Sequence, residues 1–193
     1  QVLSNDLVYQ RTIQTKLVNC SALSLDSSGR IFVADKPENK VVIFSNDGRR
    51  SGEFGAPGDG GISLVSPVFL RVDKDDEVVV VENTATGLRG RIFSKDLVLR
   101  KTFLVDKIKY VDPVRMGVNG QLKAFFNDPA GTMGIVCWDL KTGRYFGSSQ
   151  ATKDGVQFVS PGCIGADRFT DDVYVHTIPG LIKCKLPVSG AQP

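Results

Sequence analysis

The sequence has almost no histidine, since His176 is the only one among its 193 residues. Sites built from several histidines are therefore excluded, and so are the usual zinc-binding sets, because no Cys-x-x-Cys pair occurs. The chain also lacks an apolar run of 18 residues, so no segment resembles a membrane span. Basic residues never form a run longer than two and the net charge is only +3, which gives no indication of nucleic acid as a partner.

Helical periodicity is missing as well. No long window keeps apolar residues at positions i, i+3, i+4 and i+7 without an intervening Gly or Pro. The 20 glycines and 9 prolines instead help to separate short β-branched and aromatic runs, so we expect an all-β protein. The expected strands of the clearest unit are 21–25, 31–34, 41–44 and 50–54.

One pattern of turn residues recurs four times along the chain. An apolar stretch is followed six residues later by Asp or Asn, and nine or ten residues after that by another turn-type residue. The units start at Cys20, Pro67, Pro113 and Pro161, at spacings of 47, 46 and 48 residues, which are typical of propeller blades. We expect one β-propeller domain over residues 1–193. Its four blades of four antiparallel strands would span about 20–55, 66–105, 112–150 and 160–188.

The fourth unit is one strand short. Only residues 186–193 follow its third strand, and this Pro-flanked tail is unsuited to a further strand. Residues 6–13 alternate in the manner of an outer strand, so we expect them to pair with residues 181–184. The N-terminal strand would then close the last blade and complete a four-bladed ring.

Two segments carry a resemblance to a known family. Residues 21–35, SALSLDSSGRIFVAD, resemble the opening of the NHL repeat, and residues 40–48, KVVIFSNDG, resemble its continuation. The resemblance is best over residues 20–55 and 66–104. It implies a β-propeller, although NHL propellers usually carry five or six blades. Because some of them bind single-stranded RNA, it makes RNA binding the main alternative function. Propeller enzymes of similar class imply a further alternative, a metal-dependent hydrolase or lyase.

The repeat places the four cysteines in two pairs. Cys20 and Cys163 lie on inner strands of the first and last units, which a four-bladed ring makes neighbours, and Cys137 and Cys184 lie on third strands of consecutive units. Two disulfides in an oxidising compartment are one interpretation, and four buried free thiols are the other. Asn19 begins a glycosylation sequon. We therefore expect an extracellular protein, with the cytoplasm as the alternative.

Oxygen ligands occur where the second strands end. Asp35, Glu82, Asn83 and Asp128 stand at these ends and are of the kind that calcium prefers. Asp and Asn are also ordinary turn formers, and this interpretation is favoured. We expect no cofactor, and a structural calcium ion is the alternative.

The loops that would form an RNA-binding face carry mixed charge. Lys36, Lys40, Arg89 and Lys107 are offset by neighbouring Asp and Glu residues, and aromatic residues are few apart from Tyr110. RNA binding requires clustered cations together with aromatic rings on which bases stack. Nucleic acid is therefore not the expected partner.

The remaining interpretation is a rigid ring without catalytic activity, whose loops and outer strands contact another protein or copies of the same chain. The longest loop, residues 55–65, carries Ile62, Leu64 and Val65 among glycines and is the first candidate contact element. A passive connection between two units is its alternative. Further candidates are Arg89, Arg91, Trp138 and, as a pH-sensitive contact, His176.

Overall fold

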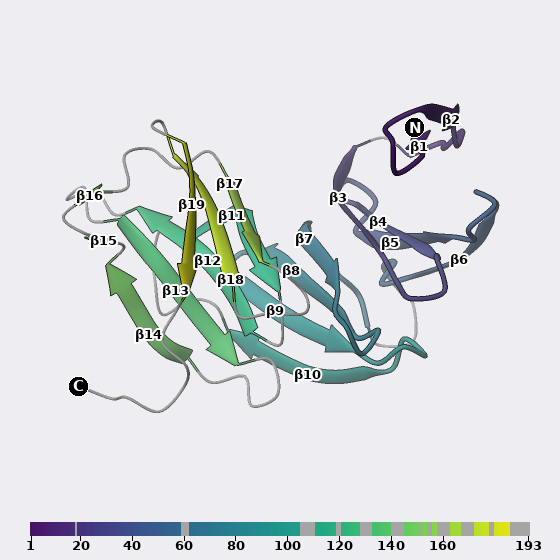
Figure 1. Ribbon diagram of the computed structural model, residues 1–193. Coiled ribbons are helices and arrows are strands. Elements are labelled where there is room, and N and C mark those ends of the chain that lie inside the picture. Colours follow the sequence, from purple (N-terminus) through teal and green to yellow (C-terminus); the bar gives the residue numbers. More distant parts are fainter. Residues whose placement is uncertain are drawn as a thin grey trace.

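The computed structural model confirms an all-β chain made of antiparallel sheets (Figure 1). It describes residues 1–17, 19–58 and 62–104 with their side chains. Beyond these it describes the side chain of Asp139 and the backbone of the strands that lie between residues 111 and 185.

Three sheets of four strands follow one another, each ordered in space as its strands are ordered in the sequence. Blade 1 contains β3 (Cys20–Leu25), β4 (Ile31–Asp35), β5 (Lys40–Phe44) and β6 (Arg50–Phe54). Blade 2 contains β7 (Pro67–Val72), β8 (Val78–Thr84), β9 (Gly87–Phe93) and β10 (Leu99–Leu104). Blade 3 contains β11 (Val111–Val118), β12 (Gln121–Asn127), β13 (Met133–Asp139) and β14 (Tyr145–Gln150). The strands expected in the first unit are all present.

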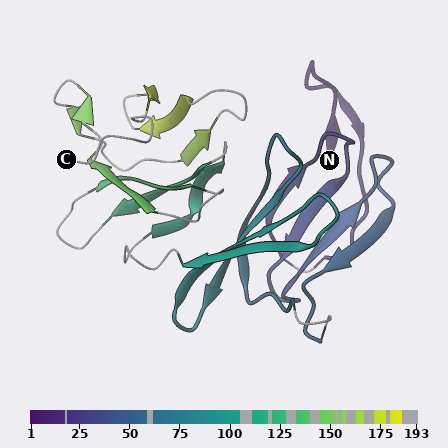
Figure 2. The same cartoon turned by 90° about the horizontal axis from the view of Figure 1, so that it is seen from below.

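A fourth sheet, blade 4, has three strands among the described residues. They are β17 (Cys163–Ala166), β18 (Asp172–Thr177) and β19 (Gly180–Lys185), and a short ribbon of β15 (Thr152–Lys153) and β16 (Val156–Gln157) precedes them. The first strands of the blades contact one another in the order β3, β7, β11 and β17. The sheets therefore form an arc, with blade 2 between blade 1 and blades 3 and 4 (Figure 2).

The expected closure by the N-terminal strand is wrong. β1 (Val2–Leu3) pairs with β2 (Tyr9–Arg11) in a separate two-stranded sheet, while β19 is an edge strand of blade 4. The chain reverses at Leu7, whose φ of 61° lies in the left-handed region, and Leu7 N donates to Ser4 O at 3.0 Å. The N-terminal segment thus satisfies its own backbone groups instead of those of blade 4.

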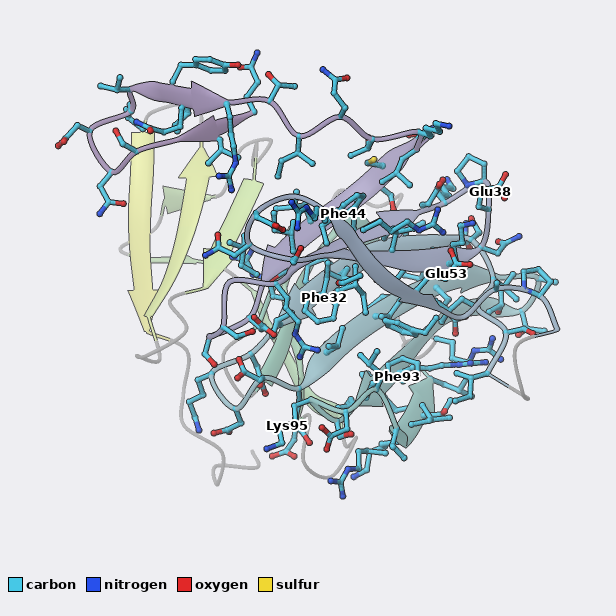
Figure 3. The ribbon with its side chains drawn as sticks, turned by 90° about the vertical axis from the view of Figure 1, so that its right-hand side faces the viewer. Phe32, Glu38, Phe44, Glu53, Phe93 and Lys95 are labelled. Carbon is cyan, nitrogen blue, oxygen red and sulfur yellow. The ribbon has the colours of Figure 1, made fainter. Side chains whose placement is uncertain are left out.

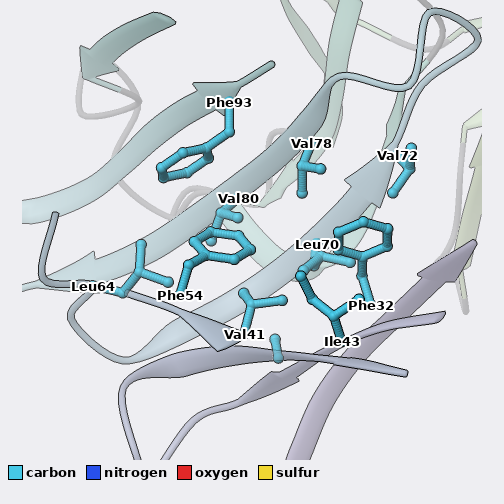
Figure 4. Close-up of a cluster of buried hydrophobic side chains, with 11 residues drawn as sticks. Phe32, Val41, Ile43, Phe54, Leu64, Leu70, Val72, Val78, Val80 and Phe93 are labelled. Carbon is cyan, nitrogen blue, oxygen red and sulfur yellow. The ribbon is translucent and has the colours of Figure 1, made fainter. Parts of the chain in front are cut away.

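Blades 1 and 2 pack face to face through one apolar core (Figure 4). Alternate residues of each strand point to the same face of a sheet, so every second residue enters this core. The Phe54 and Phe93 rings meet across it with centroids 4.9 Å apart. Burial of each large apolar side chain stabilises the fold by about 1.5 to 3 kcal/mol. The core residues are Phe32, Ala34, Val41, Ile43, Phe54, Leu64, Leu70, Val72, Val78, Val80 and Phe93.

Two serines of β3 fix the position of blade 1 against blade 2. Ser21 Oγ donates to the carbonyl of Pro67 at 2.7 Å, and Val72 N donates to Ser24 Oγ at 2.9 Å. Both bonds join β3 to β7. They allow polar groups to lie at the edge of an apolar interface without losing their hydrogen bonds.

The hairpin between the first and second strands depends on an aspartate in both blades. Asp26 Oδ1 accepts from the backbone N–H of Arg30 at 2.8 Å, and Asp73 Oδ1 accepts from that of Glu77 at 2.9 Å. Such side-chain bonds to the backbone a few residues on hold a tight turn. The two hairpins also touch, since Ser27 N donates to Asp76 Oδ1 at 2.8 Å.

The two aspartates differ in charge environment. Burial by itself would raise the pKa of Asp26, but hydrogen bonds from Arg30 and Ser28 outweigh it, and the pKa lies below its ordinary value. Arg30 Nε is 2.6 Å from Asp26 Oδ2. Burial raises the pKa of Asp73, whose backbone hydrogen bonds do not compensate fully, because Glu77 stands where blade 1 has Arg30.

We predict that Asp26→Asn destabilises the protein at pH 7 more than Asp73→Asn does. A carboxylate whose pKa is lowered on folding stabilises the fold above its ordinary pKa of 3.8, and this contribution is lost as the pH falls through the folded value. Loss of the charged hydrogen bonds should cost about 1 to 3 kcal/mol. The contribution of the Asp73 charge to stability has the opposite sign. Its pKa is raised on folding, so the negative charge opposes folding at neutral pH.

Urea denaturation of both variants at pH 7 and at pH 2 measures this difference. The deficit of Asp26→Asn should shrink at the lower pH, where the wild-type carboxylate is being protonated. Equal losses for the two variants at pH 7 would contradict the assignment.

Candidate interaction surface

The loop between β6 and β7 is less exposed than its sequence suggests. Leu64 is only 2% exposed and belongs to the core between blades 1 and 2, and Ile62 is half-buried against that core. Leu64 N donates to the carbonyl of Gly55 at 2.8 Å, which folds the loop back on itself. The expectation that Leu64 is an exposed contact residue is therefore wrong, because its side chain completes the core. Val65 remains exposed.

Arg89 and Arg91 point from one face of β9 to Glu82 of β8. Glu82 Oε2 lies 2.8 Å from Arg89 Nε and 3.0 Å from Arg91 Nε, and Oε1 accepts from Val65 N at 2.7 Å. The Glu82 side chain is 0% exposed. Burial lowers the pKa of Arg91. The negative charge of Glu82 raises this pKa, and the positive charge of Arg89 lowers it. The arginines thus neutralise a buried carboxylate that fixes the loop, and Arg91 is itself buried.

Cys20 is an exposed free thiol at the start of β3, opposite Asp35 of β4. Partial burial of the thiol raises the pKa of Cys20, and the charge of Asp35 raises it further. The disulfide between Cys20 and Cys163, one of the two interpretations of the sequence, is not formed, and the exposed position of Cys20 does not fit the other interpretation, a buried thiol. β17, which carries Cys163, packs against β11 and β12, while β3 lies at the other end of the arc beside β7.

Four other predicted residues have described backbone only. Cys137 and Trp138 lie on β13, His176 lies on β18 and Cys184 lies on β19, and their side chains are outside the described residues. Cys163 pairs with His176 in blade 4 as Ala22 pairs with Ala34 in blade 1, so His176 and Ala34 occupy equivalent strand positions. The roles of these residues stay predictions. Asn19, the predicted glycosylation site, is exposed.

The oxygen ligands proposed for calcium do not converge in blades 1 and 2. Among the side chains that the structure describes, no three His, Cys, Asp or Glu residues gather around a possible ion. Glu82 is bound by two arginines, and Asp35 is buried with its Oδ1 unpartnered. Asp128 lies outside the described part of the chain. No helix in the described ranges is long and apolar enough to cross a membrane.

The face of blade 1 turned away from blade 2 is apolar and partly uncovered. In β3, Ser24 points toward blade 2, where it bonds to β7, whereas Leu23 and Leu25 point the other way and are 54% and 48% exposed. Ile13 and Leu17 of the N-terminal segment cover the rest of this face. The covered residues are Val33, Val42 and Phe44. Figure 3 shows Phe44 on the side of the N-terminal segment and Phe32 on the side of Phe93.

Exposed apolar side chains are concentrated at this end of the arc. Six of the nine large exposed apolar residues in the described ranges lie on β3 or on the N-terminal hairpin. We call these six residues the open-end surface. They are Leu3, Leu7, Val8, Tyr9, Leu23 and Leu25. The sequence analysis missed this surface, although the alternation of leucines with Ala22 and Ser24 in β3 indicates a strand with two apolar faces.

We predict that Glu82→Gln strongly destabilises the protein, whereas the matched change Glu53→Gln has little effect. Removing the carboxylate charge leaves two guanidinium groups without their partner, which for a buried ion pair costs about 3 to 5 kcal/mol. Glu53 pairs with Lys40 at 3.2 Å but is more than a third exposed, and such pairs contribute about 0 to 1 kcal/mol. Urea denaturation at pH 7 compares the two variants, and equal midpoints would contradict a structural role of Glu82.

No family model matches the sequence, and no curated protein matches it either. Several solved structures resemble its fold. The RRP9 WD40 repeats are 15% identical with a TM-score of 0.55, and the match covers 90% of this chain and 53% of that one. The Cps50 (Swd1) β-propeller domain of Myceliophteria thermophila is 11% identical with a TM-score of 0.57, covering 87% and 54%. A streptogramin B lyase is 17% identical with a TM-score of 0.49, covering 88% and 55%.

These similarities concern the fold. The sheets of this chain follow one another as blades of a β-propeller do, and the chain spans about half the length of the solved structures that it matches. The fold of the protein is that of a β-propeller.

Proposed function

We propose that the protein is a non-enzymatic protein-interaction or assembly module, in which the packed blades hold the open-end surface in place. The observation that carries this proposal is the concentration of exposed leucine, valine and tyrosine side chains on β3 and the N-terminal hairpin. Exposed apolar side chains that gather at one end of a protein commonly bind a partner. The similar structures include the RRP9 WD40 repeats and the Cps50 (Swd1) β-propeller domain. A propeller that holds a contact surface in place agrees with this similarity of fold.

The catalytic alternative has less support from the described side chains. A metal-dependent hydrolase or lyase needs several oxygen ligands that converge on one ion. Asp26 and Asp73 are engaged in turns, and Glu82 is bound by Arg89 and Arg91. These carboxylates accept hydrogen bonds that hold two turns and a loop, and no three His, Cys, Asp or Glu residues in the described part of the chain lie around a common point.

A relationship to NHL propellers is part of the proposal, and RNA binding is the main alternative function. The segments that resemble the NHL repeat form β3, β4 and β5 of blade 1. Two of the cations considered for an RNA-binding face are already paired, because Lys40 meets Glu53 and Arg89 meets Glu82. Paired cations attract phosphate less, which favours a protein partner.

An extracellular location also belongs to the proposal, supported by the exposed position of Asn19 in its sequon. Expression through a secretory pathway should yield a chain that loses mass on treatment with an N-glycosidase. The Asn19→Gln variant should show no such loss. An unglycosylated secreted chain would remove this support.

The interaction itself can be tested by placing a photoreactive residue at Leu23 or, as a control, at Val98, which is 60% exposed on the turn after β9. Irradiation in extract of the source organism should give a protein adduct from position 23 and none from position 98. The protein identified by mass spectrometry should bind the purified chain, and Leu23→Lys should weaken that binding at least tenfold.

The RNA alternative predicts a different result. Retention on single-stranded RNA that falls steeply with salt, together with no protein adduct from position 23, would overturn the proposal in favour of RNA binding.

A further inference from the structure

We propose that Arg89 and Arg91 form a binding site for one carboxylate group, at the edge of the core between blades 1 and 2. Strand register places Arg91 opposite Val80, a residue of that core, so both arginines lie on the face of blade 2 that is turned toward blade 1. The open-end surface lies on the other side of blade 1. The inference therefore does not rest on the proposed function.

The charges around Glu82 do not balance. Two guanidinium groups face one carboxylate, since Arg89 Nε and Arg91 Nε lie 2.8 Å and 3.0 Å from the same oxygen, Oε2. The second oxygen, Oε1, accepts from a neutral group, the backbone N–H of Val65, at 2.7 Å. One positive charge is therefore left over.

The excess charge is costly where it lies. Arg91 is buried, and a charge removed from water without a full counter-charge opposes folding. Burial lowers the pKa of Arg91 below its ordinary value, and the negative charge of Glu82 does not fully offset this, because the positive charge of Arg89 acts against it. A second anion beside the two arginines would supply the missing charge.

Most N–H groups of the two arginines are not used by the fold. Arg89 Nε donates to Glu82, whereas Arg91 Nε is buried and makes no hydrogen bond, because its N–H does not point at the oxygen 3.0 Å away. Among the described residues, no other group hydrogen-bonds or pairs with either guanidinium. The Nη groups lie close together, since both Nε atoms face one oxygen. Such a fork of donors matches the two oxygens of a carboxylate.

The outer strand of blade 2 leaves the arginines accessible. Strand register places Leu104 of β10 opposite Arg89 and Thr102 opposite Arg91, on the same face of the sheet. Thr102 and Leu104 are exposed, and the Arg89 side chain is itself 27% exposed. A carboxylate can therefore approach over β10, where an apolar group attached to it would contact Leu104.

The size of the excess charge selects the kind of anion. A carboxylate carries one negative charge and balances the one positive charge left over, whereas a doubly charged phosphate exceeds it. A single site of this kind also differs from an RNA-binding face, which needs many phosphate contacts. Two sources supply such a group: a small organic acid, and an acidic side chain of another polypeptide.

The test is an NMR titration of the full chain at pH 6, where acetate is ionised, with the signals of the arginine Nε–H groups as the readout. Acetate should shift the signals of Arg89 and Arg91 to saturation and leave that of exposed Arg71 nearly unchanged. Arg89→Lys keeps a positive charge beside Glu82 but removes the fork, so it should raise the dissociation constant for acetate about fivefold or more. The matched change Arg71→Lys should not alter it.

Two tripeptides blocked at both ends distinguish the sources. Tighter binding of acetyl-Ala-Glu-Leu-amide than of acetate would indicate an acidic side chain of a partner, and equal affinities would indicate a small organic acid. The neutral peptide acetyl-Ala-Gln-Leu-amide should not bind in either case.

Circular dichroism and the urea midpoint check that Arg89→Lys is folded. If it is not, the wild-type titration decides, because saturable shifts must be confined to Arg89 and Arg91. The proposal is overturned by shifts of the same size with chloride, by tighter binding of inorganic phosphate than of acetate, or by unchanged acetate binding in folded Arg89→Lys.

Discussion

The apolar contact between neighbouring sheets is the constraint on which the rest of the structure depends. A four-stranded sheet has two faces, and when both are apolar neither can be left to water without loss of stability. Blade 1 buries one face against blade 2, where the rings of Phe54 and Phe93 meet. Blade 2 in turn buries Val79 and Val81 of β8 on its other face. Each blade thus requires a neighbour, and the arc follows from this requirement.

Polar groups at the blade edges take part in the same contact. Ser21 and Ser24 form hydrogen bonds with β7. Asp76 accepts a hydrogen bond from the backbone N–H of Ser27 in the neighbouring hairpin. Glu82 is the costliest of these groups to bury, and two arginines and the Val65 N–H offset its desolvation. Residues that seem suited to catalysis or binding in the sequence therefore serve mainly to join strands, loops and blades.

The open end of the arc is where the same requirement is only partly met. Ile13 and Leu17 cover Val33, Val42 and Phe44, but no described segment covers Leu23 and Leu25. The N-terminal segment thus acts as a partial substitute for a blade. A surface that the fold prepares for a neighbouring sheet is a natural place for a protein contact.

The sequence by itself determined the strands, their grouping in fours and the tight turns, because alternation and turn chemistry are local properties. The strands expected at 21–25, 31–34, 41–44 and 50–54 could be predicted for this reason, and so could the propeller fold. Whether Leu64 is exposed could not be predicted, because its burial depends on a loop that folds back onto two sheets.

Only the tertiary structure decided the pairing of the N-terminal strand, the partners of Arg89 and Arg91, and the free thiol of Cys20. Each depends on which segments meet in space. The repeat fixes the blades, but the curvature between them decides whether the first and last blades meet. That curvature comes from the packing of side chains between the sheets, which the period of the sequence does not specify.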